Sequence, residues 1–204
     1  LDIINEEDPV MVHGYMPNAG YVDVRTAVAD SLNRRFGMDY GPENILMTVG
    51  AASGLNDILK TILNPGDQVL TFAPFFVEYS SYVKNYDGEL VVVPPDTSTF
   101  QPDLEEFEKR INHRTKAVIV NNPNNPTGVV YSEETIRRMA GVLERKSREI
   151  GHPIVLISDE PYRELVYDGV QVPYIPKFYK DTVVVYSYSK SLSLPGERIG
   201  YLAI

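Results

Sequence analysis

The residues with the clearest chemical potential lie near the end of the chain, in Tyr186-Ser-Tyr-Ser-Lys190 and in Arg198, eight residues after the lysine. They follow Thr182-Val-Val-Val185, a β-branched run that is typical of a buried strand. A lysine at the end of such a strand can lose its proton and attack a carbonyl carbon. An arginine close by can bind a phosphate through two hydrogen bonds. The two side chains therefore predict a site for an aldehyde cofactor that carries a phosphate.

Unusual residues also follow other short apolar runs. They lie in Gly50-Ala-Ala-Ser53, Pro74-Phe-Phe76, Asn121–Gly128 and Asp159-Glu-Pro-Tyr162. Ligands of open α/β sheets bind beyond the carboxyl ends of the strands, so these segments are expected to meet in one crevice. In the first segment, backbone N–H groups at the start of a helix could bind a phosphate, although simple strand-to-helix packing is about as probable for that segment alone.

Taken singly, several of these residues have ordinary explanations. Phe76 alone is more often a core residue than a stacking plate, Asn125 alone is usually a turn former, and Lys190 alone is most often a solvated lysine. Asp159 differs, because an acid after an apolar strand enters a partly buried site and needs a cationic partner. A protonated ring nitrogen would supply one, and Tyr162 could donate a hydrogen bond to a phenolate oxygen of the same cofactor.

The apolar pattern predicts the elements that would position these segments. Short apolar runs alternate with helical periodicity, which indicates an α/β layered structure, and most runs are continuous, so both sheet faces should be covered. Predicted strands are Ile45–Val49, Gln68–Phe72, Leu90–Val93, Ala117–Asn121, Ile154–Ser158, Thr182–Tyr186 and Ile199–Ile204. Predicted helices are Val24–Phe36, Ser53–Leu63, Leu104–Ile111 and Ser132–Ile150. No repeat or linker divides the chain, so one domain is expected.

Composition narrows the function further. The 204 residues include no cysteine, which excludes disulfides, thiolate nucleophiles and Cys-ligated metals. His13, His113 and His152 are scattered without metal-ligand spacing, so no metal is predicted. The net charge of −9 argues against a nucleic-acid surface. No apolar run approaches the about 20 residues of a membrane span, and no secretion leader is visible. A cytoplasmic protein is expected.

Two nucleotide-binding classes are disfavoured. A hydrophobic strand followed by Asp159-Glu160 resembles the metal-binding acid of a P-loop ATPase, but that class needs a Gly-x-x-x-x-Gly-Lys-Ser/Thr loop. The segment Gly50-Ala-Ala-Ser-Gly-Leu-Asn56 lacks the lysine and has the wrong length. A Gly-x-Gly-x-x-Gly motif, which dinucleotide-binding domains use, is also absent.

In five places the chain resembles the pyridoxal-phosphate aminotransferases of fold type I, class I/II group: Tyr15-Met-Pro-Asn-Ala-Gly20, Asn124-Asn-Pro-Thr-Gly128, Asp159-Glu-Pro-Tyr162, Ser187-Tyr-Ser-Lys190 and Arg198. Each motif is weak alone, but five in this order are specific, and they span nearly the whole chain. The resemblance implies a three-layer sandwich around a seven-stranded, mostly parallel sheet whose last strand is antiparallel. It also implies that residues 1–204 are the cofactor-binding large domain, without the N-terminal segment and the small C-terminal domain, which supplies the arginine for the substrate carboxylate.

The same resemblance implies roles around the cofactor ring. Lys190 forms the internal aldimine with pyridoxal 5′-phosphate and, once released, moves a proton as the catalytic base. Asp159 pairs with the pyridinium nitrogen. Asn125 and Tyr162 hydrogen-bond the 3′-oxygen, and Tyr162 is also expected to take part in catalysis. Phe76 stacks on the ring, at a position where family members often have a larger aromatic residue.

The phosphate would be bound by Ser187, Arg198 and the amides of Ala51 and Ala52. Tyr15 matches a family tyrosine that reaches the phosphate of the neighbouring subunit, which implies a homodimer.

The implied reaction is transamination between an L-amino acid and a 2-oxo acid, in ping-pong fashion. Two alternatives stay open at this point. One keeps the cofactor but changes the reaction to that of a C–S lyase or decarboxylase. The other is a cofactor-sensing regulator with an aminotransferase-like domain, which usually carries an N-terminal DNA-binding module that this acidic chain does not suggest.

Overall fold

The computed structural model describes residue 6 and residues 8–204. The chain divides into two compact units, residues 1–47 and residues 48–204. That residues 1–204 form one cofactor-binding domain stays a prediction.

The first unit contains α2 (Pro9–His13), α3 (Val22–Phe36), the 3-10 turn η1 (Pro42–Asn44) and the first residues of β1 (Ile45–Thr48). Arg25 of α3 holds it together, because its Nη1 donates to the carbonyl of Pro42 at 2.7 Å and its Nε to that of Gly20 at 3.1 Å. Helix α3 was predicted. Helix α2 was not, because five residues are too few for a helical period to show.

The strands form one seven-stranded sheet in the order β1-β7-β6-β5-β4-β2-β3. After β1, the strands are β2 (Gln68–Phe72), β3 (Glu89–Val93), β4 (Thr115–Asn121), β5 (Val155–Asp159), β6 (Thr182–Ser187) and β7 (Gly200–Ala203). Pairs β2–β3, β2–β4, β4–β5 and β5–β6 are parallel, whereas β6–β7 is antiparallel. The predicted α/β fold with a mostly parallel sheet and an antiparallel last strand is therefore confirmed.

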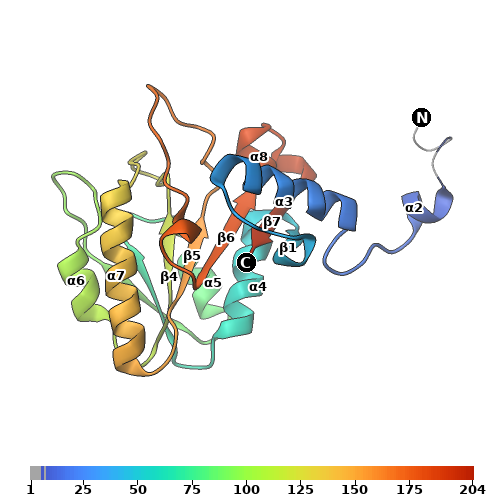
Figure 1. Cartoon of the computed structure of the whole chain (residues 1–204). Helices are drawn as coiled ribbons and strands as arrows, with labels where there is room; N and C mark the ends of the chain where they lie inside the picture. Colours follow the sequence, from blue (N-terminus) through green and yellow to red (C-terminus); the bar gives the residue numbers. More distant parts are fainter. Residues whose placement is uncertain (1–5, 7) are drawn as a thin grey trace. The chain divides into compact units, whose positions relative to one another are not determined.

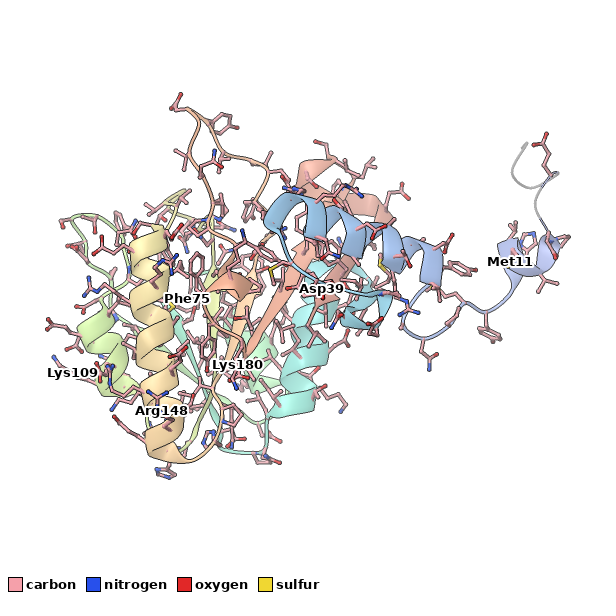
Figure 2. The ribbon with its side chains drawn as sticks, viewed as in Figure 1. Met11, Asp39, Phe75, Lys109, Arg148 and Lys180 are labelled. Carbon is pink, nitrogen blue, oxygen red and sulfur yellow. The ribbon has the colours of Figure 1, made fainter. Side chains whose placement is uncertain are left out.

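Helices cover both faces of the sheet within the second unit (Figure 1). On one face, α6 (Leu104–Arg110) and α7 (Glu133–Ile150) pack on β2–β5 around Phe107 and Leu143, which are fully buried. Figure 2 shows Lys109 of α6 and Arg148 of α7 on the solvent side of this layer, and both are exposed. On the other face, α4 (Gly50–Ile62) contacts β6 and β7, and α5 (Tyr79–Lys84) contacts β3.

Helix α4 begins three residues before the predicted Ser53. Gly50 is its first residue and has a φ of 80°, which a glycine adopts without steric cost, so the chain turns directly from strand into helix. Helices α5 and α8 (Tyr188–Ser191) were not predicted, because neither is long enough to show an apolar stripe. Residues 170–180, between β5 and β6, contain the 3-10 turn η2 (Ile175–Lys177).

The described residues contain neither a membrane-spanning helix nor a cluster of metal ligands. No helix among them is long and apolar enough to cross a membrane. No group of three or more His, Asp or Glu side chains among them could hold a metal ion.

Candidate active site

A cavity of about 220 Å³ lies at the carboxyl ends of β4, β5 and β6. Nine of the ten predicted site residues line it: Ala51, Ala52, Phe76, Asn125, Asp159, Tyr162, Ser187, Lys190 and Arg198. The structure thus brings together residues from five separate parts of the sequence. The tenth, Tyr15, belongs to the first unit and its side chain is fully exposed. The roles of all ten stay predictions.

The register of the central strands sets the floor of the cavity. Asn121, the last residue of β4, pairs with Asp159, the last residue of β5. Its Nδ2 donates to the backbone oxygen of Asp159 at 3.0 Å, and its Oδ1 accepts from the backbone N–H of Asn125 at 2.6 Å. Asn125 Nδ2 in turn donates to the hydroxyl of Tyr162 at 3.2 Å. One asparagine therefore links both loops that carry the predicted 3′-oxygen ligands.

Asp159 is a buried acid with one unused oxygen. Its side chain is 4% exposed. Tyr79 donates its hydroxyl proton to Oδ2, whereas Oδ1 is buried and has no hydrogen-bond partner within residues 8–204 or in residue 6. Burial raises the pKa of Asp159 to about 7, the hydrogen bond from Tyr79 lowers it, and the charge of Glu160 raises it. A buried carboxylate oxygen without a donor fits a cationic N–H group, such as a protonated pyridine nitrogen.

The opposite side of the cavity is suited to an anion. Helix α4 begins at Gly50, so the N–H groups of its first turn, including Ala51 and Ala52, have no partner within the helix. A Cβ atom on Gly50 would lie 2.8 Å from Nη2 of Arg198, so only glycine allows the guanidinium group this close. Nη1 of Arg198 donates to the carbonyl of Pro195 at 3.0 Å. A positive charge and a helix N-terminus thus meet at one point.

Lys190 lies on the short helix α8, directly after β6. Ser187 caps this helix, because its Oγ accepts from the N–H of Ser189 at 3.1 Å. The same hydroxyl donates to Oγ of Ser189 at 2.8 Å. The cap fixes the turn that places Lys190 on the cavity wall, where its side chain is exposed.

Four polar residues in or next to the cavity did not enter the sequence prediction as site residues: Tyr79, Tyr82, Asn121 and Ser189. Asn121 had a usable signal, since a polar residue ended a predicted buried strand. Ser189 had one too, two residues after Ser187. Tyr79 and Tyr82 had none, because helix α5 itself was not visible in the sequence pattern.

On the other face of the sheet, the next residue forms a buried ion pair. Glu160 is 1% and Arg163 4% exposed, and Oε2 of the glutamate lies 2.6 Å from Nε of the arginine. Ser158 donates its hydroxyl proton to Oε1 of Glu160 at 2.6 Å. The guanidinium carbon of Arg163 lies 4.8 Å from the ring centre of Tyr186 and 5.4 Å from that of Tyr174.

Comparison with known proteins matches these features to one family. The family model described as aminotransferase class I and II matches residues 3–204. The chain belongs to this family. The predicted resemblance is therefore confirmed, and the family depends on pyridoxal phosphate.

Several relatives of this aminotransferase-family chain are similar over almost its whole length. A probable aspartate/prephenate aminotransferase of Thermus aquaticus is 39% identical over 92% of the chain and 48% of its own length. A crystal structure of an amino transferase from Eubacterium rectale has a TM-score of 0.97 and 48% identity, over all of this chain and 51% of that one. The structure of the aspartate aminotransferase of Thermus thermophilus with maleate has a TM-score of 0.82 and 34% identity, over 95% of this chain and 50% of that one.

The chain thus spans about half the length of the relatives that it matches. The relatives also differ in their named activities. One of them, an N-succinyldiaminopimelate aminotransferase from Mycobacterium tuberculosis, has a TM-score of 0.86 and 32% identity, over 94% of this chain and 50% of that one.

Proposed function

We propose that this chain binds pyridoxal 5′-phosphate as part of an aminotransferase that exchanges an amino group between an L-amino acid and a 2-oxo acid. The observation that supports this most strongly is one cavity with three chemically distinct groups. Lys190 supplies a primary amine, Asp159 a buried carboxylate oxygen without a donor, and Arg198 a guanidinium group beside a helix N-terminus.

The cavity residues divide by the part of the cofactor that each would hold. Asp159 would bind the ring nitrogen through Oδ1, Phe76 would stack on the ring, and Asn125 with Tyr162 would bind the 3′-oxygen. The phosphate ligands would be Arg198, Ser187 and the first N–H groups of α4, at Ala51 and Ala52. When bound, the cofactor supplies a ring that accepts the electron pair left when a proton leaves the substrate's α-carbon.

The chain's own residues then have defined tasks. Nζ of Lys190 takes the proton from the α-carbon and later returns a proton. The negative charge of Asp159 holds a positive charge on the ring nitrogen. Burial and the neighbouring Asp159 raise the pKa of Tyr162. Its hydroxyl therefore keeps its proton at neutral pH and can donate it in a hydrogen bond.

The wider setting is also a proposal. Residues 1–204 form the large domain of a cytoplasmic enzyme, and the enzyme is a homodimer in which Tyr15 binds the phosphate held by the partner subunit. The exposed Tyr15 side chain suits this role, because it needs no partner within its own unit.

Borohydride reduction tests the site directly. The full-length protein is incubated with pyridoxal phosphate, reduced and digested, and we expect a pyridoxyl group on Lys190. The matched control is K180R, because Lys180 is exposed and precedes β6, at the end of that strand far from the cavity (Figure 2). Labelling should persist in K180R and vanish in K190R. A label on another lysine would overturn the assignment.

A panel of amino donors tests the reaction. Formation of the matching 2-oxo acid together with pyridoxamine phosphate would support transamination. Release of carbon dioxide or of a thiol instead would show that the reaction is decarboxylation or C–S cleavage.

A further inference from the structure

Tyr79 is the fully buried residue that touches the predicted ring-nitrogen ligand. It begins helix α5 and is 0% exposed, and its hydroxyl donates to Oδ2 of Asp159. Two aromatic rings hold it in place. The ring of Phe75 stacks on that of Tyr79, with ring centres 6.4 Å apart and an interplanar angle of 10°. The ring of Phe76 meets it edge-on, with ring centres 5.7 Å apart and an interplanar angle of 77°.

The two oxygens of Asp159 are therefore not equivalent. Oδ2 accepts from Tyr79 and, at 3.4 Å, from Nδ2 of Asn121, whereas Oδ1 has no donor among the described residues. A carboxyl group can rotate about its last bond, so something must fix which oxygen is presented to the cavity. The rigidly packed tyrosine on α5 does so.

We propose that Tyr79 is a positioning residue of the cofactor site, whose hydroxyl occupies Oδ2 of Asp159 and thereby leaves Oδ1 for the ring nitrogen of pyridoxal phosphate. The inference rests on the proposed function only in its last step, because the bond between Tyr79 and Asp159 exists in the chain itself.

The electrostatics of the surrounding groups agree with this role. Burial and the charge of Glu160 both raise the pKa of Asp159, and the bond from Tyr79 opposes them. Burial, followed by the charge of Asp159, raises the pKa of Tyr79 well above its usual range, so the phenol stays a donor. Burial raises the pKa of Tyr82 and of Tyr162, and the charge of Asp159 raises both further. Lys190 and Arg198 line the same cavity.

The phenol also links two parts of the site. Phe76, the predicted stacking residue, packs edge-on against the ring of Tyr79, and the hydroxyl of Tyr79 donates to Asp159. A phenylalanine at position 79 keeps the first contact and removes only the second. Y79F therefore isolates the hydrogen bond.

The test uses the full-length protein with Y79F and, as a matched control, Y131F. Tyr131 is equally a buried tyrosine, but it packs on Phe72 and does not hydrogen-bond Asp159. The first measurement needs no cofactor. Infrared spectra of protein labelled with 13C-aspartate follow the carboxyl band of Asp159 with pH, and D159N identifies that band. The second is the dissociation constant for pyridoxal phosphate.

We expect Y79F to raise the titration midpoint of Asp159 by about one pH unit, because a hydrogen bond to the ionised form is lost. The dissociation constant should rise by about 10-fold to 100-fold, as for loss of a hydrogen bond to a charged group. Y131F should leave both values unchanged. Site-specific 3-fluorotyrosine at position 79 provides a second variant that preserves the fold, and its stronger donor should shift the midpoint downward.

A midpoint that stays the same in both position-79 variants would overturn the proposal, as would a shift of equal size in Y131F. A shifted midpoint with an unchanged dissociation constant would also overturn it, because the bond would then not serve the cofactor. If the wild-type protein failed to bind pyridoxal phosphate at all, the proposed function would fail, whereas the infrared result would still report on Tyr79 and Asp159.

Discussion

Asp159 and Glu160 are adjacent, both acidic and both almost fully buried, yet they lie on opposite faces of the sheet with opposite surroundings. Successive side chains of a strand point to opposite faces, so Asp159 faces the cavity and α5 while Glu160 lies on the side of Ser158 and Arg163. Glu160 has a cation at 2.6 Å, whereas Asp159 has a phenol on Oδ2 and, in the part of the chain that the structure describes, no hydrogen-bond donor on Oδ1.

The difference separates an acid that is paired within the chain from one that is proposed to bind the cofactor. A buried charge that finds its counter-ion within the chain contributes to the folded state, and its removal leaves an uncompensated partner. A buried charge that lacks one destabilises the empty chain and is compensated only by a ligand. Burial alone therefore does not mark a functional acid, but burial with an unused oxygen in a cavity does.

The largest effect is expected from breaking the structural pair. R163M leaves Glu160 buried without its cation and should lower the free energy of unfolding by about 3 to 5 kcal/mol, measured by urea denaturation. The control is R137M, which breaks the ion pair between Arg137 and Glu133, whose side chains are 64% and 59% exposed. That change should cost less than about 1 kcal/mol. Equal losses in the two variants would show that the Glu160 pair is not special.

The next effect concerns the binding acid. D159N removes the charge that would pair with the ring nitrogen and should weaken pyridoxal phosphate binding by about 100-fold. The free energy of unfolding of the cofactor-free protein should rise at pH 8, because the unpaired buried charge is gone. E160Q should do the reverse, with lower stability and almost unchanged affinity. A D159N protein that binds the cofactor normally would remove the distinction between the two acids.

A pH dependence follows from the raised pKa of Asp159. With a pKa of about 7 against an ordinary value of 3.8, the folded chain holds a proton between about pH 4 and pH 7 that the unfolded chain has released. Stability from this group is therefore greatest at the acidic end and is lost as pH rises to about 7.

The measurement compares cofactor-free wild type with D159N by urea denaturation at pH 5 and pH 8. The stability of wild type relative to D159N should fall by about 2 to 3 kcal/mol between these values. Glu160 also makes stability depend on pH, because burial raises its pKa. This dependence is common to both proteins and cancels in the comparison. A difference independent of pH would mean that Asp159 ionises as an ordinary acid.

The smallest effect is expected at Ser158, which donates to Glu160 but not to Asp159. S158A removes one hydrogen bond of 2.6 Å to a charged group and should lower the free energy of unfolding by about 1 to 2 kcal/mol. Cofactor affinity, measured by the same titration as for D159N, should be unaffected. A marked loss of affinity would mean that the two faces of the sheet are coupled through β5.

Much of this site could be predicted from local sequence. Continuous apolar runs predicted all seven strands, and each predicted strand end lies within two residues of the observed one. Because parallel strands end at the same edge of a sheet, the position of Asp159, Asn125 or Lys190 just after such a run was enough to predict that they converge. Helix α5 escaped prediction, because six residues in a mixed polar and aromatic stretch show no helical period.

The sequence by itself determined the strands, the strand ends that carry chemically active residues, and the family. The reason is that strand periodicity and motif spacing are local properties of the chain. Only the tertiary structure decided which oxygen of Asp159 is occupied and where Glu160 finds its cation. It also showed that Tyr79, 80 positions away in sequence, donates to Asp159. The physical reason is that burial and hydrogen-bond pairing depend on neighbours in space, and two adjacent acids at the end of β5 acquire different neighbours because their side chains lie on opposite faces of the sheet.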